Sequence, residues 1–356
     1  MTERAQKLLQ AMHLDEHAGV LVYNPSNMFY LSGYKGEGLV LVAQGLNAII
    51  TDFRYTEQAE KEAPGFQVCM IGGGKTHEDS AGELCAQHGL TALYYEDTYI
   101  TVHTFENLRK SIPGVEWRSV AGAIEKQREV KDAGELELME EACRLTGDAF
   151  QRILPFIKEG VTEKEIALRL DFDMMSHGAS APSFSTIVAA GAHGSLPHAV
   201  PGDYKIRKGD MITMDFGARY GNYCADMTRT VALGQPSDEM RKVYQTVLDA
   251  QKMAQDAVMA GKVCNQIDSI ARDYIYDHGY KGRFGHGLGH SVGIDIHENP
   301  RFSQNCADVL RAGQVMTVEP GIYLPGVGGV RIENSVVVLE NGCKPLTTPE
   351  RELIIL

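Results

Sequence analysis

Hydrophobic residues follow two patterns along the chain. The first 122 residues contain short, strand-like apolar runs separated by Gly, Pro and Asn turns and by short helical segments. These runs are 19–25, 38–44, 47–53, 66–72 and 92–97. The alternation predicts a small α/β domain over 1–122, and the segment 118–131 is the expected connection to the rest of the chain.

A helical pattern begins after this connection. Asp132 and Glu135 form a capping box, and apolar residues then recur at helical spacing as far as Gly160. This stripe consists of Leu136, Met139, Ala142, Leu145, Ala149, Ile153 and Ile157. A second box, Thr162 to Glu165, predicts a helix that ends at 177–178.

The segments 237–260 and 265–278 repeat this arrangement of a long helix followed by a shorter one. In both pairs a glycine precedes a His-Gly pair by the same interval: Gly160 and His177-Gly178, Gly261 and His278-Gly279. We therefore expect 123–356 to form a second domain with two similar halves, each a helix pair followed by a β-hairpin. The chain is then of the α/β (α+β) class, with a site between the halves.

Composition excludes several classes of function. The formal charge of −13 argues against a nucleic-acid surface, which needs clustered Lys and Arg. Seven cysteines without a Cys-x-x-Cys pair fit a reducing cytoplasm, and we expect neither a signal peptide nor a membrane span. The Gly-Lys-Thr at 74–76 is not a phosphate-binding loop, because Cys69 stands where that motif requires glycine.

Two aspartates stand on a predicted hairpin at 208–234. If its turn is centred between Tyr220 and Gly221, Asp215 lies directly opposite Asp226. A turn at Gly221-Asn222 changes the partners but keeps both aspartates on one face, because a loop with an even number of residues preserves the alternation. Like charges so placed destabilise a hairpin unless a cation lies between them.

Two glutamates stand on a second predicted hairpin. Glu319 precedes Pro320 and is expected to be extended, and Glu333 alternates with apolar residues on a strand. The two carboxylates are expected to face each other, with Arg331 on the face of Glu333. A lone pair of acids usually marks a solvated strand face, but two pairs in matching halves, flanked by apolar residues, indicate a metal site.

Charge balance favours two metal ions, since two divalent cations offset four carboxylates. A donor set of carboxylates and one imidazole suits manganese, cobalt or iron, with zinc as an alternative, and two such ions favour hydrolysis. Histidines stand among glycines in FGHGLGHSVGIDIH, residues 284–297. The glycines disfavour a helix there, and an extended segment would also place His286 and His290 on one face.

These motifs resemble the aminopeptidase P and prolidase branch of the pita-bread metallopeptidases. The resemblance rests on MDFGARYGNYCADMTRT, HGLGHSVGIDIHE, TVEPGIY and VRIEN, and covers nearly the whole chain. NMFYLSGY and TDFRYTEQA are similar to a creatinase-type N-terminal domain. The resemblance implies a creatinase-like α/β domain over 1–122 and a pita-bread domain with two pseudo-symmetric halves over 123–356.

The resemblance also assigns the site. Asp215 would bind one metal ion, Asp226 and Glu333 would bridge both, and His290 and Glu319 would complete the second ion's shell. Glu319 is further implied as a proton shuttle. The implied substrate contacts are His198 and His297, supported by Arg331. We expect His286 to lie behind the ligands, and His177 and His193 to be structural.

The implied activity is hydrolysis of the bond before proline in small peptides, with two divalent ions, manganese first. We favour an Xaa-Pro aminopeptidase, with an Xaa-Pro dipeptidase (prolidase) as the alternative. A creatinase-like amidinohydrolase works without metal, and a binding protein on this fold would have lost ligands, so the filled ligand set argues against both. The acidic charge and the absence of targeting signals indicate a cytoplasmic enzyme, and a homodimer is the family expectation. Tyr30 and Tyr34 are candidates for the contact with the second copy, although internal packing is the commoner role.

Overall fold

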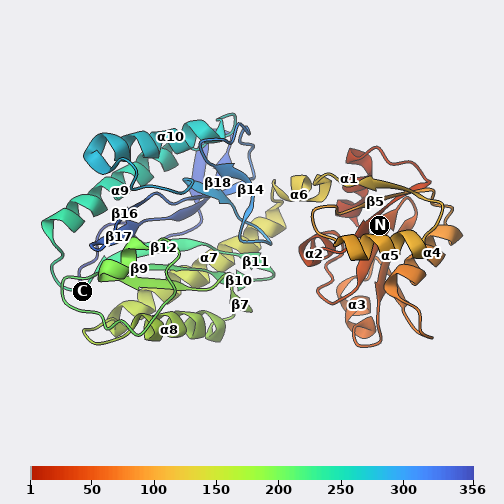
Figure 1. Ribbon diagram of the computed structural model, residues 1–356, viewed down its shortest axis with the longest axis horizontal. Helices are drawn as coiled ribbons and strands as arrows, with labels where there is room; N and C mark the ends of the chain where they lie inside the picture. The colour runs from red at the N-terminus through yellow and green to blue at the C-terminus, as the bar shows by residue number, and fades with distance from the viewer. Residues whose placement is uncertain (1) are drawn as a thin grey trace. The chain divides into compact units, whose positions relative to one another are not determined.

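The computed structural model describes residues 2–356, and the chain divides into two compact units. The first is Met1–Arg128 and the second is Glu129–Leu356 (Figure 1). The sequence places this division earlier, after residue 122. The difference is the short helix α6 (Ala123–Arg128), which packs against helices of the first unit.

A six-stranded mixed sheet forms the centre of the first unit, in the order β4-β3-β2-β1-β5-β6. The strands are β1 (Ala18–Val22), β2 (Leu39–Ala43), β3 (Leu46–Thr51), β4 (Gln67–Met70), β5 (Ala92–Tyr95) and β6 (Glu116–Ser119). The other helices of this unit are α1 (Glu3–Ala11), α2 (Pro25–Ser32), α3 (Thr56–Glu62), α4 (His77–Gln87) and α5 (Val102–Ser111). The strands β1, β2 and β3 are buried along their whole length, which explains their continuous apolar sequences.

The five predicted runs all contain strands, β1 to β5. The sequence misses β6, which lies within or beside the expected connection. This strand lies at the edge of the sheet beside β5, and most of its side chains are exposed. A strand with little to bury has no apolar run to reveal it.

Tyr30 and Tyr34 are buried, with 4% and 0% of their surface exposed. The Tyr34 hydroxyl donates to the Glu37 carbonyl oxygen at 2.8 Å and lies 3.1 Å from Thr51 Oγ1. Internal packing therefore accounts for both tyrosines, and neither is available as a surface contact for a second copy. The homodimer itself stays a prediction.

Four long helices frame the second unit: α7 (Ala133–Ile153), α8 (Glu163–Ser176), α9 (Asp238–Asp256) and α10 (Cys264–Ile275). Both predicted capping boxes are present, at the starts of α7 and α8. The helix α7 ends at Ile153 rather than near Gly160. Pro155 explains this early end, because it cannot donate to the helix and instead opens a short 3-10 turn, η1 (Leu154–Phe156).

The strands of the second unit form several small sheets, each built within one half of the unit. In the first half they are β7 (Ala181–Pro182), β8 (Ile187–Ala190), β9 (Met211–Phe216), β10 (Ala218–Tyr220), β11 (Tyr223–Cys224) and β12 (Met227–Ala232). In the second half they are β13 (Gly289–Ser291), β14 (Glu298–Phe302), β15 (Val315–Val318), β16 (Gly321–Leu324), β17 (Gly328–Arg331), β18 (Asn334–Leu339) and β19 (Gly342–Pro345). The short helical turn η2 (Gly191–Ser195) lies between β8 and β9, and η3 (Tyr276–Tyr280) lies between α10 and β13.

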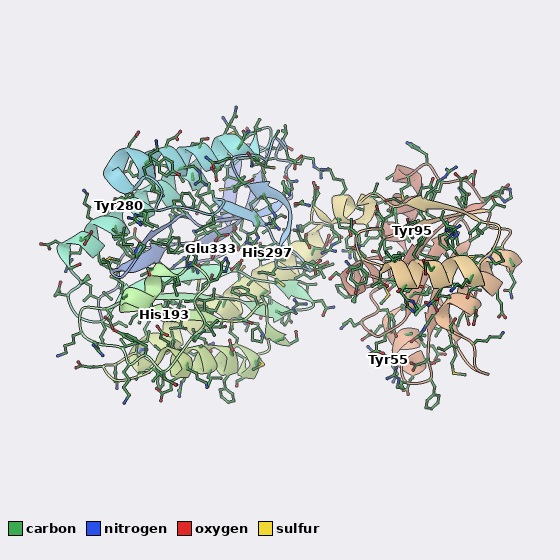
Figure 2. The ribbon with its side chains drawn as sticks, viewed as in Figure 1. Tyr55, Tyr95, His193, Tyr280, His297 and Glu333 are labelled. Atoms are coloured by element: carbon green, nitrogen blue, oxygen red, sulfur yellow. The ribbon has the colours of Figure 1, made fainter. Side chains whose placement is uncertain are left out.

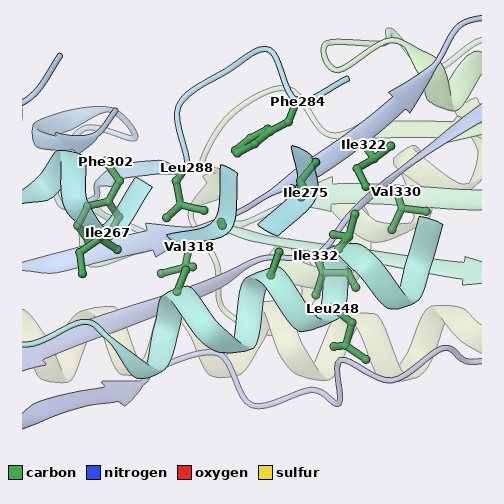
Figure 3. Packing of buried hydrophobic residues seen from close by; sticks show 14 of the residues in the cluster. Leu248, Ile267, Ile275, Phe284, Leu288, Phe302, Val318, Ile322, Val330 and Ile332 are labelled. Atoms are coloured by element: carbon green, nitrogen blue, oxygen red, sulfur yellow. The ribbon is translucent and has the colours of Figure 1, made fainter. Parts of the chain in front are cut away.

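Each half has its own hydrophobic core. Residues of α7 and α8 pack against β8, β9 and β12 in the first half. In the second half, residues of α9 and α10 pack against β15 to β18, with Leu248 near Ile332 and Ile267 beside Phe302 (Figure 3). The chain therefore builds the same arrangement of a helix pair on a hairpin twice.

The predicted repeat is visible in single residues. Gly160 and Gly261 have φ of 90° and 83°, a left-handed conformation that favours glycine. His177 Nδ1 donates to the carbonyl oxygen of Asp173 at 2.8 Å, and His278 Nδ1 makes the same contact with Tyr274 at 2.8 Å. His177 is thus part of a helix end, as expected for a structural histidine.

In the part of the chain that the structure covers, residues 2–356, no helix has both the length and the apolar character needed to cross a membrane.

Candidate metal centre

The hairpin with the first pair of acids turns at Gly221-Asn222, where both residues have positive φ, 54° and 71°. Such turns suit the twist of a hairpin, and Gly and Asn adopt them readily. The resulting register pairs Asp215 with Thr228. Of the two registers that the sequence allows, the observed one is that with the turn at Gly221-Asn222, and Asp215 does not lie directly opposite Asp226.

Both aspartates still share a face of this hairpin. Asp226 lies between β11 and β12, at a point where the two sides of the hairpin approach each other very closely. A Cβ at Gly217 would lie only 1.8 Å from the carbonyl oxygen of Ala225. Only glycine fits at position 217. The close approach of the backbone at Gly217 and Ala225 lets the Asp226 side chain point toward Asp215.

The second pair of acids lies at a matching interruption in the second hairpin. The strands β15 and β18 pair on one side of it, and β16 and β17 pair on the other, in one continuous register. Glu319 and Glu333 occupy the gap between the two ladders, across from each other. In the first half only Asp226 lies at such an interruption, because Asp215 belongs to β9 and pairs with Thr228.

The two hairpins meet at Thr228 and Glu333. The Glu333 backbone N–H donates to the Thr228 carbonyl oxygen at 3.1 Å, and Thr228 Oγ1 donates to Glu333 Oε2 at 2.8 Å. This contact brings carboxylates of both halves together. Asp215, Asp226 and Glu333 each offer one oxygen, and these oxygens all lie within 4.8 Å of one another.

The acids are buried without enough partners. Asp215 Oδ1 and Glu333 Oε1 are buried and have no hydrogen-bond partner among the described residues. Burial raises the pKa of Asp226 well above its usual range, and the negative charges of Glu333 and Asp215 raise it further. A cluster of this kind fits divalent cations, which supply the missing partner and the missing charge.

His290 completes the donor set from β13. Its Nδ1 donates to the Ser291 carbonyl oxygen at 3.1 Å, so Nε2 is the nitrogen left to bind a metal ion. This Nε2 lies 3.3 Å from Glu319 Oε1 and 3.6 Å from Asp226 Oδ2. Burial acts to raise the pKa of Glu319, but the hydrogen bond with His290 and nearby positive charges hold it at about 2.

Arg331 lies beside the acids and is almost fully buried. Its Nη2 donates to Asp215 Oδ2 at 2.6 Å, and its Nε donates to Thr228 Oγ1 at 3.1 Å. Its Nη1 donates to the Tyr323 hydroxyl at 2.9 Å, and that oxygen lies 2.9 Å from His286 Nε2. Arg331 therefore fixes Asp215, while His286 lies behind Tyr323.

A cavity of about 590 Å³ opens onto this cluster. All five expected ligands line it, together with His198, His286, His297 and Arg331. The His297 ring lies 4.5 Å from the His290 ring, and Figure 2 shows His297 close to Glu333 in the second unit. Desolvation lowers the pKa of His297, and electrostatic interactions with His290 and Arg301 lower it further, so neutral imidazole is favoured.

Every residue expected at the site lies at this cavity. His193, which is expected to be structural, is not among the residues that line the cavity. Its Nδ1 lies 2.9 Å from the buried carboxylate of Glu163. The sequence reasoning misses Thr228, Tyr323 and Arg301. Thr228 follows from the register once the turn is placed at Gly221-Asn222, whereas the other two carry no comparable signal.

Two family models match the chain. Metallopeptidase family M24 matches residues 137–340, and the Creatinase/Prolidase N-terminal domain matches residues 4–130. The chain belongs to metallopeptidase family M24. It is therefore a metallopeptidase, and the expected creatinase-type and pita-bread domains are confirmed.

Similar proteins share the whole length of this M24 chain. An Xaa-Pro dipeptidase from Bacillus anthracis is 38% identical, with 99% of each chain covered and a TM-score of 0.95. An X-Pro aminopeptidase from Thermotoga maritima MSB8 is 36% identical, with 99% of this chain and 100% of that chain covered and a TM-score of 0.93. An Xaa-Pro dipeptidase of Pyrococcus furiosus is 36% identical over 99% of this chain and 100% of its own length.

Proposed function

We propose that this metallopeptidase is an Xaa-Pro dipeptidase, a prolidase. The sequence favours an aminopeptidase, but the similar proteins from Bacillus anthracis and Pyrococcus furiosus carry the name Xaa-Pro dipeptidase and support the alternative better. We further propose that two divalent ions, manganese first, are held by Asp215, Asp226, His290, Glu319 and Glu333. The buried, unpartnered oxygens of two of these acids support this proposal.

The observation that carries the choice of a dipeptidase is Arg301. A dipeptidase must bind the free carboxylate that follows proline, whereas an aminopeptidase must leave that side open. Arg301 on β14 lines the cavity and pairs across the strands with His290. The other cavity arginine, Arg331, is already bound to Asp215. A guanidinium is well suited to a carboxylate, so we assign the proline carboxylate to Arg301.

The remaining side chains have distinct roles in this proposal. Two ions held by these residues would supply an activated water molecule and a polarised scissile carbonyl. Glu319 takes a proton from the water and passes it to the leaving nitrogen of proline. His198 and His297 hold the carbonyl and the proline side of the bond. Arg331 keeps the Asp215 carboxylate in place.

Initial rates on Ala-Pro and Ala-Pro-Ala, with the manganese-loaded protein, test the choice. We expect the dipeptide to be cleaved and the tripeptide to be a poor substrate. An Asp226→Asn variant, prepared in the same way, excludes a contaminating peptidase. Cleavage of the tripeptide would make the protein an aminopeptidase, the second candidate, which the similarity to the Thermotoga maritima X-Pro aminopeptidase supports.

Arg301→Met tests the proposed carboxylate contact. Loss of a charge-assisted hydrogen bond should raise the KM for Ala-Pro by roughly tenfold or more. The KM for Ala-Pro amide, which has no carboxylate, should change little. Equal effects on both substrates would show that Arg301 does not bind the carboxylate.

A further inference from the structure

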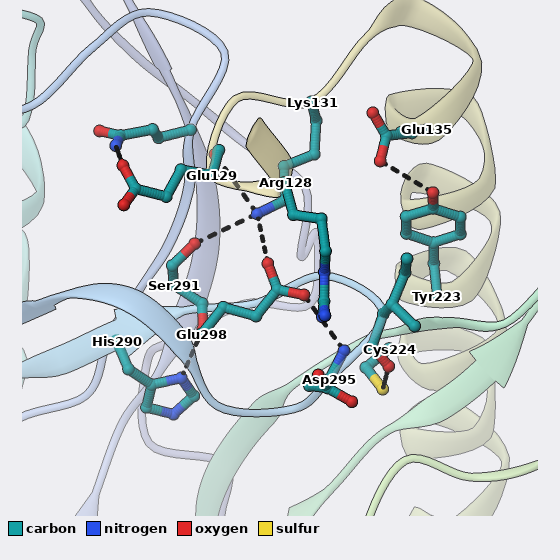
Figure 4. Close-up of polar contacts among 12 residues, drawn as sticks. Arg128, Glu129, Lys131, Glu135, Tyr223, Cys224, His290, Ser291, Asp295 and Glu298 are labelled. Carbon is teal, nitrogen blue, oxygen red and sulfur yellow. Dashed lines mark hydrogen bonds and ion pairs between the residues drawn. The ribbon is translucent and has the colours of Figure 1, made fainter. Parts of the chain in front are cut away.

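Lys131 is a buried lysine beside the segment that carries His290 and His297 (Figure 4). Its side chain is only 1% exposed. The ammonium donates to Glu298 Oε2 at 3.0 Å, to Ser291 Oγ at 3.2 Å and to the Glu129 carbonyl oxygen at 3.4 Å. A lysine is rarely buried to this degree, because losing its hydration costs free energy that only close partners offset.

Ser291 links this ammonium to His290. Its hydroxyl oxygen accepts from Lys131, and its carbonyl oxygen accepts from His290 Nδ1 at 3.1 Å. This bond sets the tautomer and orientation of the imidazole, with Nε2 toward Glu319. Lys131 therefore fixes the position of Ser291, which in turn orients the His290 imidazole.

Glu298 links the same ammonium to the other end of the segment. It directly follows His297, and its Oε1 accepts from the Asp295 backbone N–H at 3.2 Å. The carboxylate also packs onto Gly293, where a Cβ would lie 2.6 Å from Glu298 Oε1. The turn before His297 therefore packs against the carboxylate of Glu298, which is bound to Lys131.

The position of Lys131 is itself fixed by the backbone. Its N–H donates to the Gly313 carbonyl oxygen at 2.9 Å, and the next residue, Asp132, caps α7. Lys131, Ser291 and Glu298 are not among the described residues that line the cavity, so they act through other residues and not on a substrate.

We propose that Lys131 is a positioning residue for the hydrolytic reaction. Through Ser291 and Glu298 its ammonium fixes both ends of the segment 290–298, and so sets where His290 and His297 enter the cavity. The proposal rests on the proposed function, which gives these two histidines their roles at the metal ions and the substrate.

Lys131→Met should lower kcat for Ala-Pro by roughly 10- to 100-fold, the range found when residues supporting metal ligands are lost. This variant also removes the buried ion pair between Lys131 and Glu298, so its Tm should fall. A loss of activity in this variant alone does not separate positioning from stability, and a second variant is needed.

The double variant Lys131→Met/Glu298→Gln separates an effect on positioning from an effect on stability. It removes both charges, so the Tm in chelator should return toward that of the wild type. If Lys131 positions the segment, kcat stays at least tenfold lower, and calorimetry with Mn²⁺ shows metal binding at least tenfold weaker. Recovery of kcat and metal affinity together with the Tm would show a purely structural ion pair and overturn the proposal.

Arg311→Met is the matched control. Arg311 donates to Glu129 Oε2 at 2.6 Å, so its loss breaks a neighbouring ion pair outside the segment 290–298. Its kcat and metal affinity should equal those of the wild type. If the wild type cleaves no Xaa-Pro dipeptide, the proposed function fails, while Mn²⁺ affinity of the double variant still decides whether Lys131 positions His290.

Discussion

At the scale of single residues, the centre is a set of acids that the fold buries at a cost. Burial raises the pKa of Glu333 well above its usual range, and the charges of Glu319 and Asp215 raise it further. Among residues 2–356, Thr228 Oγ1 donates to Glu333 Oε2, and Glu333 Oε1 has no hydrogen-bond partner. In the metal-free protein the carboxylates therefore repel one another, and bound cations would remove this repulsion.

Glu333→Gln should stabilise the metal-free protein. Because the pKa of Glu333 is raised, the folded chain binds more protons than the unfolded chain above pH of about 4.3, and stability falls as pH rises through that range. Removing the charge should raise the free energy of unfolding at pH 8 by about 1–2 kcal/mol, with less effect at pH 4. Urea unfolding in chelator at both pH values measures this.

The control for this experiment is the same pair of proteins with excess Mn²⁺. The wild type should gain stability from bound metal, and the variant should gain much less, so that their order reverses. A variant less stable than the wild type in chelator at pH 8 would contradict the account.

The acids themselves were predictable, because strand alternation and matching halves mark them in the sequence. Their neighbours were not. Tyr323 and Lys131 act on the site through contacts between segments far apart in the chain, such as the bond from Lys131 to Glu298, and Thr228 follows only from the exact position of the hairpin turn. Alternation along one strand carries no information about such contacts.

At the scale of elements, the strand runs of the first unit and the helix starts of the second follow from local physics, namely apolar runs and capping boxes. The errors also have local causes. Pro155 ends α7 early, and the exposed β6 has no apolar run. The turn at Gly221-Asn222 then decides which register the first acid hairpin adopts.

Gly217→Ala should open this hairpin, since the new Cβ would lie 1.8 Å from the Ala225 carbonyl oxygen. The strands must separate there, which should cost about 2–3 kcal/mol of stability and displace Asp226, with weaker Mn²⁺ binding. Gly261→Ala is a suitable control, because its positive φ costs about 1 kcal/mol while the space around it is open. Urea unfolding and calorimetry compare the two, and unchanged Mn²⁺ affinity in Gly217→Ala would count against this role of the glycine.

At the scale of the whole molecule, the second unit builds one centre from two similar halves. Asp215 and Asp226 come from the first half, and His290, Glu319 and Glu333 come from the second. The repeat and the acid pairs predict a shared site from the sequence, and the assignment of His290 comes from the family resemblance. The choice between dipeptidase and aminopeptidase is not, because it depends on which charged group faces the far side of the cavity.

The number of Mn²⁺ ions bound by the metal-free protein tests the central claim most directly, namely that the two hairpins form one centre for two metal ions. Titration calorimetry should give two ions per chain for the wild type, and fewer for Asp226→Asn, which weakens a ligand proposed to bridge both. A wild type that binds one ion or none, or an Asp226→Asn variant that still binds two with unchanged affinity, would contradict the account.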